Sequence, residues 1–397
     1  MALTDFQTYF SPTYQEILSK TLVGKKIAST RFQSNLKYGD TVTRFALDLS
    51  AVQVRTISNL TDRTVDPITD SEQNLTINFI KGTTFPLANL EKIQAGPLNP
   101  GEVAGREVAI KVATALDAFI LGETVNAFAV FDTGNLTTMA PSGVPITLNS
   151  TTVPQIVTRT EARLRANNVS MMDLCWVLDP YAISDIAQYP IGKDITAENV
   201  TFRNGLKGNI YGAEVYLSNN LTGEATLVYT GSHVNNQALT INGVTFTAVT
   251  TIGSTAGNFL ASASDSTTGI TNLAALLNAP GTTNANQVAL SAADQATINA
   301  LNITATATST TVLTIVCKGS GRLTLTEAQT NATWATNFIH AYYGMKGAID
   351  VVIQAEDDMV MLQEPKQRTV NILCDIVAGI KTFTDGSQKF LDVKINA

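Results

Sequence analysis

The sequence predicts an α+β protein in which a small second α+β domain interrupts a larger host domain. Three features indicate this class: segments of alternating apolar residues near both ends, one long amphipathic helix, and an abrupt loss of charge over residues 231–338. A chain of 397 residues is long enough for two or three domains, each with its own core.

Residues 1–38 form an arm that is basic, although the chain as a whole carries a formal charge of −7. Between residues 17 and 38 no acidic residue occurs, and the basic residues are Lys20, Lys25, Lys26, Arg31 and Lys37. The acidic total argues against a protein whose main task is gripping nucleic acid, because phosphate binding requires a dense field of Lys and Arg. Two uses of the arm stay open, pairing with acidic neighbours and contact with nucleic acid.

Residues 39–82 predict a long two-stranded loop. Period-two alternation over residues 39–57 and 73–80 indicates strands with one covered face, and the segment between them is polar and rich in turn residues. An isolated hairpin is marginally stable in water. We therefore expect something else to lie against this loop.

The clearest helix spans residues 99–122. Asn99 can cap it, Pro100 suits the first helical position, and Gly122 can end it. Apolar residues recur at helical spacing on one face and polar residues line the other. At 1.5 Å per residue the helix should be about 30 Å long.

Residues 150–230 predict a helix over 152–168, an apolar strand over 173–179, and a second helix opened by Asp179 and Pro180. Glycines at 205, 208 and 212 precede an alternating apolar segment. Because no helix follows whose amino-terminal N–H groups could hold a phosphate, we interpret these glycines as turns rather than as a nucleotide loop.

Residues 231–338 form a low-charge, threonine-rich module. Its 108 positions carry five charged residues: Asp265, Asp294, Lys318, Arg322 and Glu327. The module predicts a hairpin turned at Asn242 and Gly243, a short helix that begins at residue 267 and is ended by Asn278 and Pro280, and a strand over 307–319. Since the earlier character of the chain resumes afterwards, we interpret the module as an insertion at a loop of the host domain.

Few side chains predict chemistry. His233 and His340 are the two histidines, and neither has a metal-ligating partner at suitable spacing. Glu356, Asp357 and Asp358 form an acidic triplet that we interpret as a solvated turn, with a bound cation or a salt link between subunits as the alternatives. Cys175, Cys317 and Cys374 are far apart in apolar surroundings and predict buried free thiols. No catalytic or cofactor residues are assigned, no apolar segment approaches 18 residues, and the start lacks the pattern of an export signal.

The order of these parts resembles the major capsid proteins of tailed bacteriophages. The segments that carry the resemblance are "YGDTV", "GREVAIKVATALDAFIL", "RLRANNVSMMDLCWVLDPYAISDI", "FRNGLKGNIYGAEVYLSNNL" and "AGIKTFTDGSQKFLDVKI". These capsid proteins share the fold named after phage HK97. The layout is most similar to the coat-protein branch typified by phage P22, in which an extra domain also interrupts the host domain. The resemblance covers about residues 20–230 and 339–395.

This resemblance implies a division of the chain into capsid parts. Residues 1–38 would be the N-terminal arm, 39–82 the E-loop, 83–149 the peripheral domain with its spine helix at 99–122, 150–230 and 339–370 the axial domain, 231–338 the inserted domain, and 371–397 strands that return to the peripheral domain. The five basic arm residues and the acidic triplet are its candidate assembly residues.

The resemblance also implies partners. The chain would assemble with itself as hexamers and pentamers into an icosahedral shell in the host bacterial cytoplasm, with a separate scaffolding protein, a portal, and packaged double-stranded DNA held weakly at the inner face. No membrane contact is expected, and the Lys and Asn positions that cross-link in the founding member of the fold find no match here. The competing interpretations are a surface-adhesive or glycan-binding protein built on the threonine-rich module, a phage tail or decoration protein, and an enzyme with a dispersed site.

Overall fold

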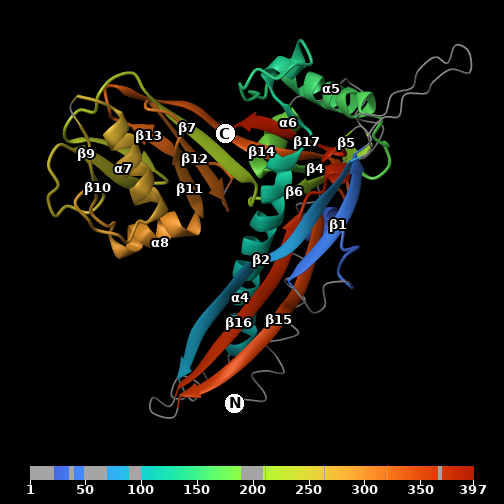
Figure 1. Ribbon diagram of the computed structural model, residues 1–397, viewed down its shortest axis with the longest axis horizontal. Coiled ribbons are helices and arrows are strands. Elements are labelled where there is room, and N and C mark those ends of the chain that lie inside the picture. Colours follow the sequence, from blue (N-terminus) through green and yellow to red (C-terminus); the bar gives the residue numbers. More distant parts are fainter. Residues whose placement is uncertain are drawn as a thin grey trace, which may run out of the picture.

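The computed structural model of the protein describes residues 22–34, 40–48, 69–88, 100–188, 209–210, 212–262, 264–319, 321–364 and 369–397. These residues form a mixed helix and sheet structure, which confirms the predicted α+β class (Figure 1). The described helices, including two short 3-10 helices, are α2 (Gly24–Ile27), α4 (Pro100–Leu121), η1 (Gly122–Asn126), η2 (Thr133–Leu136), α5 (Thr152–Ala166), α6 (Pro180–Gln188), α7 (Thr267–Asn278), α8 (Ala292–Ala300) and α9 (Thr384–Ser387). In this described part of the chain, no helix has the length and apolar character needed to span a membrane.

A four-stranded antiparallel sheet with the order β1-β2-β16-β15 forms the elongated part of the molecule (Figure 1). Its strands are β1 (Thr41–Asp48), β2 (Thr69–Ala88), β15 (Asp350–Glu364) and β16 (Thr369–Lys381). Helix α4 runs alongside this sheet, and the ring of Phe79 in β2 stacks on that of Phe119 in α4 with centroids 4.5 Å apart. Of the strand predicted over residues 39–57, residues 41–48 form β1 and those beyond 48 lie outside the described residues. The strand predicted over 73–80 is confirmed within β2, and β16 pairs with the other edge of β2.

A nine-stranded sheet lies beside it, with the path β11-β12-β7-β14-β4-β6-β5 and with β17 and β3 off that path. Its strands are β3 (Ala129–Phe131), β4 (Leu174–Leu178), β5 (Asn209–Ile210), β6 (Ala213–Leu217), β7 (Thr222–Tyr229), β11 (Ile303–Ala307), β12 (Val312–Lys318), β14 (Ala332–Met345) and β17 (Phe390–Asn396). Gly212 turns the chain between β5 and β6 with a φ of 81°, as a turn residue should. Gly205 and Gly208 lie outside the described residues.

Two large hydrophobic cores lie in different parts of the molecule. The first core joins α4, strands β2, β15 and β16 of the four-stranded sheet, and strands β4, β6, β14 and β17. The second core joins α7, α8, β11, β12, part of β7 and the small sheet β10-β9-β8-β13, built from β8 (Gln237–Ile241), β9 (Val244–Val249), β10 (Asn258–Leu260) and β13 (Leu325–Glu327). Asn242 and Gly243, both at positive φ, turn the predicted hairpin between β8 and β9.

One sequence interpretation needs correction. Glu356, Asp357 and Asp358 lie within strand β15, where the pairing with β16 shifts register between Ala355 and Asp358, and so they belong to an irregular stretch of a strand rather than to a turn. Pairing along β2 and β14 also runs straight through the boundaries predicted at 82 and 338, because backbone hydrogen bonding continues where side-chain character changes. The assignment of these parts to named domains stays a prediction.

Candidate assembly site

The described part of the basic arm, residues 22–34, packs on its own chain. Leu22 and Ile27 are fully buried in the first core, and Gly24 approaches α4 so closely that an added Cβ would lie 2.8 Å from Cβ of Ile120. The N–H of Gly24 donates to Oδ1 of Asp117 in α4 over 2.5 Å. The arm therefore packs on helix α4.

Asp117 joins the arm to a second segment. Its Oδ2 accepts hydrogen bonds from Oγ of Ser218 at 2.8 Å and Nδ2 of Asn220 at 3.2 Å, just after β6. Burial raises the pKa of Asp117, although the donated hydrogen bonds oppose that rise. A buried carboxylate is tolerated when donors surround it, so Asp117 fixes the relative positions of the arm, α4 and the segment after β6.

The arm then runs along the start of edge strand β15. The N–H of Ser29 donates to the carbonyl of Ile349 and the N–H of Val351 donates to Ser29, while the Gln33 side chain bonds both backbone groups of Ile353. An uncovered strand edge is a template for pairing with another chain. These contacts occupy the first residues of that edge.

Arg31 adds an ion pair to the contacts that hold the arm on its own chain. Its guanidinium lies 2.6 Å from Oδ2 of Asp350, whose side chain is fully buried. Burial raises the pKa of Asp350 and the Arg31 charge opposes that effect. Arg31 also lies above the ring of Phe32 at 4.9 Å.

A second arginine, Arg44 in β1, lies 2.5 Å from Asp385 in α9 and above the Phe383 ring. Burial raises the pKa of Asp385, but Arg44 and Arg31 outweigh burial and hold that pKa below its ordinary value. The C-terminal segment, the arm and β1 thus meet around one acidic side chain.

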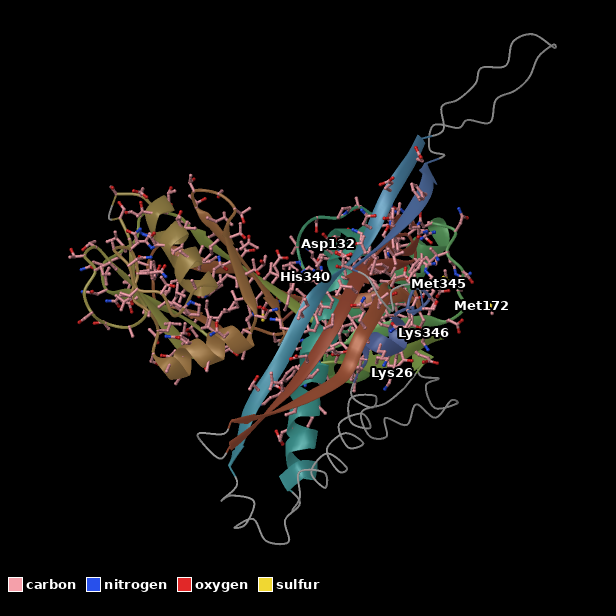
Figure 2. All side chains as sticks on the ribbon, turned by 60° about the horizontal axis from the view of Figure 1, so that its bottom comes forward. Lys26, Asp132, Met172, His340, Met345 and Lys346 are labelled. Carbon is pink, nitrogen blue, oxygen red and sulfur yellow. The ribbon has the colours of Figure 1, made fainter. Side chains whose placement is uncertain are left out.

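The remaining candidate assembly residues are placed as follows. Lys25 and Lys26 lie in α2, where Lys25 is half-buried and Lys26 is exposed. Figure 2 shows Lys26 on the side of the molecule away from the second core. Lys20 and Lys37 lie outside the described residues. The triplet Glu356–Asp358 follows Asp350 along β15, so that strand receives Arg31 at its start and carries the triplet further on.

The long sheet carries exposed apolar side chains beside its buried ones. In β2 Leu75 and Phe79 are buried, whereas Ile80 is 71% exposed, and Phe45 in β1 is 65% exposed. Isolated exposed apolar residues are common, but here both stand on a thin four-stranded sheet that extends from the first core.

Sequence reasoning did not find Asp117, Asp350 or Asp385. Each is a single acidic residue within a helix or strand, and its partner is at least 93 residues away in the chain in every pair named above. Among the described residues, no group of three or more His, Cys, Asp or Glu could hold a metal ion. The site consists of ion pairs and packing surfaces.

Comparison with known proteins gives a structural likeness without a sequence family. No family model matches the chain, and no curated protein matches it. A chain from Mycobacterium phage Che8 is 14% identical with a TM-score of 0.51, over 94% of this chain and 91% of that chain. A capsid structure of cyanophage P-SCSP1u is 9% identical with a TM-score of 0.47, over 95% and 88% of the two chains. The mature capsid of bacteriophage PhiM1 is 9% identical with a TM-score of 0.45, over 94% and 86%.

The likeness to the Che8 chain defines the fold class. It extends over nearly the full length of both chains, and it therefore includes the long sheet, α4 and the part that contains the second core. At this level of identity the comparison shows a shared fold.

Proposed function

We propose that this chain is the major capsid protein of a tailed double-stranded DNA bacteriophage, with the HK97 fold and an inserted domain. The observation that carries the proposal is the fold shared with the Che8 phage chain over 94% of the sequence. The ordered series of segments that resembles major capsid proteins supports the same conclusion independently. On this proposal the protein is a structural component of the virion shell rather than an enzyme.

The physical properties of the long sheet suit a shell subunit. A thin sheet that exposes Phe45 and Ile80 gains stability when further apolar surface covers it. In a closed shell each subunit has neighbours on all sides, so many modest contacts combine through high effective concentration. Hexamers and pentamers of the chain would supply those neighbours.

The charge distribution suits enclosure of DNA. A net charge of −7 would repel the packaged polyanion and keep it releasable. In the described part of the basic arm, Arg31 already forms an ion pair with Asp350 of the same chain. We therefore expect contact with DNA, a scaffolding protein or a portal to depend on other basic residues of the arm.

Expression of the chain alone and together with a scaffolding protein tests the proposal. We expect closed shells in sedimentation gradients, and electron microscopy should resolve rings of six and five subunits. A protein that remains a compact monomer in both conditions, at every concentration and salt tried, would contradict the capsid role.

A further inference from the structure

Strand β14 connects the two cores. Its residues 332–339 pair with β7, its residues 342–345 pair with β4, and β17 pairs with residues 338–344. Because β17 overlaps both other partners, β7 and β4 must follow one another along the same edge of β14. His340 and Ala341 occupy the step between them, and Figure 2 shows His340 at this junction.

His340 is buried at that step between two carboxylates. Its Nδ1 lies 2.9 Å from Oδ2 of Asp392 in β17, and its Nε2 lies 3.2 Å from Oε2 of Glu224 in β7. Only 2% of His340 is exposed. Asp392 belongs to β17, whose neighbouring residues are in the first core, whereas Glu224 lies near the start of β7, which continues into the second core.

The hydrogen-bonding capacity of imidazole decides the charge of this group. A neutral imidazole has one N–H and one acceptor nitrogen, whereas imidazolium has two N–H donors. Both ring nitrogens of His340 face carboxylates, which accept but do not donate when ionised. Only the imidazolium satisfies both contacts.

We propose that protonated His340 is an ionic joint that holds β7 of the second core to β17 of the first core, and that the joint loosens when its proton is lost at alkaline pH. This inference concerns the single chain and goes beyond a role in a shell.

The surrounding charges agree with that assignment. Asp392 and Glu224 face His340 directly, and Lys394 stands opposite it in the β14–β17 register with its Nζ 4.6 Å from the centre of the Phe338 ring. Burial lowers the pKa of His340, but the two carboxylates outweigh burial and raise that pKa to about 9. The hydrogen bond from His340 lowers the pKa of Glu224 in turn, against the opposing effect of burial.

A second ion pair limits how far the joint can loosen. Arg322, on the segment after β12, donates to both carboxylate oxygens of Asp179 at the start of α6, over 2.5 and 3.4 Å. Arginine keeps its charge throughout the relevant pH range. Loss of the His340 proton should therefore loosen the start of β7 without detaching the second core.

Nuclear magnetic resonance of the two histidines gives a direct test, because His233 serves as an internal control. Burial lowers the pKa of His233, which lies in the second core and contacts no carboxylate in the described contacts. We expect carbon-13 and nitrogen-15 signals of His340 to show imidazolium at pH 7.5 and to titrate well above those of His233. Titration of His340 at or below pH 6.5 would overturn the proposal.

A second measurement asks whether the proton holds the junction. Hydrogen-exchange protection of the β7 amides, corrected for intrinsic exchange at each pH and compared with β4, should fall roughly tenfold per pH unit between 7 and 9. In Glu224→Gln this fall should be smaller, because the carboxylate on the second-core side is gone. Glu161→Gln, which removes a partly exposed partner of Arg165 on α5, should behave like the unmodified chain. Equal pH dependence in the unmodified chain and Glu224→Gln would also overturn the proposal.

Discussion

Arg31 and Arg44 approach the C-terminal segment from two places near the start of the chain. Arg31 pairs with the fully buried Asp350, and Arg44 pairs with the half-exposed Asp385. A buried carboxylate that loses a cationic partner retains more of the penalty of its desolvation. Breaking the Arg31–Asp350 pair should therefore lower the free energy of unfolding more than breaking the Arg44–Asp385 pair.

Replacing Arg31 tests the first pair. Arg31→Gln should lower the free energy of unfolding by about 1–3 kcal/mol, the penalty of leaving one buried polar partner unsatisfied. Urea denaturation at pH 7 would measure this change. As a control, Arg165→Gln breaks an exposed i,i+4 pair with Glu161 and should change the same quantity by about 0.3–0.5 kcal/mol. Equal effects of the two substitutions would show that Arg31 does not compensate the buried charge of Asp350.

Acid should weaken the same region through Asp385. Its pKa in the folded chain lies below the ordinary value of 3.8, so the ion pair with Arg44 contributes stability that is present above about pH 4 and is lost as pH falls through the lowered pKa. In Asp385→Asn the thermal midpoint should therefore fall less between pH 5 and pH 3 than in the unmodified chain. Calorimetry at these two pH values would measure the difference, and parallel curves would exclude Asp385 as a source of acid sensitivity.

Strand β7 depends on glycine at its second position. An added Cβ on Gly223 would lie 1.8 Å from the carbonyl oxygen of Gly321, closer than any real contact. The strand and the segment after β12 can therefore meet only because Gly223 has no side chain. This close approach brings Arg322 to Asp179.

Gly223→Ala should separate β7 from the segment that carries Arg322. We expect a loss of several kcal/mol in the free energy of unfolding, about 3 or more, because backbone must move. Gly253→Ala is a matched control, since nothing lies within 4 Å of its added Cβ and its φ is not in the left-handed region. That control should change stability by less than about 1 kcal/mol. An unperturbed Gly223→Ala variant would contradict the packing described for this junction.

The long sheet offers a test of assembly that spares the fold. Ile80→Asp places a charge on an exposed position, so the single chain should remain folded by circular dichroism while shell formation falls at least about tenfold in sedimentation. Met172→Asp, at a loop residue that is 73% exposed, is the comparison variant and should assemble more fully. Normal shells from Ile80→Asp would show that this face of β2 is not covered by a neighbour.

In the described part of the chain, the two large cores are joined through one continuous sheet. A deletion intended to remove the low-charge module must therefore retain Phe338, which is buried, pairs with Asn396 and packs against His340. Thr230 directly follows β7 and Asn331 directly precedes β14. The N–H of Thr230 donates to the carbonyl of Asn331, so the two ends of the segment to be deleted lie close together. Removal between these residues preserves the strands that complete the first core.

Replacing residues 232–330 by an Asn-Gly turn should leave the first core folded. Calorimetry should retain a cooperative transition, while the newly exposed apolar residues of β7 should reduce solubility. The same replacement extended through Phe338 should unfold the region around β17. If the shorter deletion abolished all cooperative unfolding, the first core would require the second for its stability.

Local pattern predicted the elements whose signals lie within a few residues. The helix near residues 99–122, the strand near 173–179 and the hairpin at Asn242 and Gly243 follow from capping, apolar periodicity and turn chemistry, and the structure has all three. The sequence also separated the low-charge module, because composition changes abruptly there. Its exact ends stay a prediction, and β14 carries one backbone hydrogen-bond ladder across the boundary predicted at residue 338.

Long-range partners were decided by tertiary structure alone. Asp117, Asp350 and His340 each resemble an ordinary residue of a helix or strand in the sequence, and their roles arise from partners brought together across many residues by packing. Glu356–Asp358 show that local polarity can also mislead. Their charge indicated a turn, but pairing with β16 extends the strand through them. Periodicity reports which face of an element is apolar, but only the completed fold determines which charge lies opposite another.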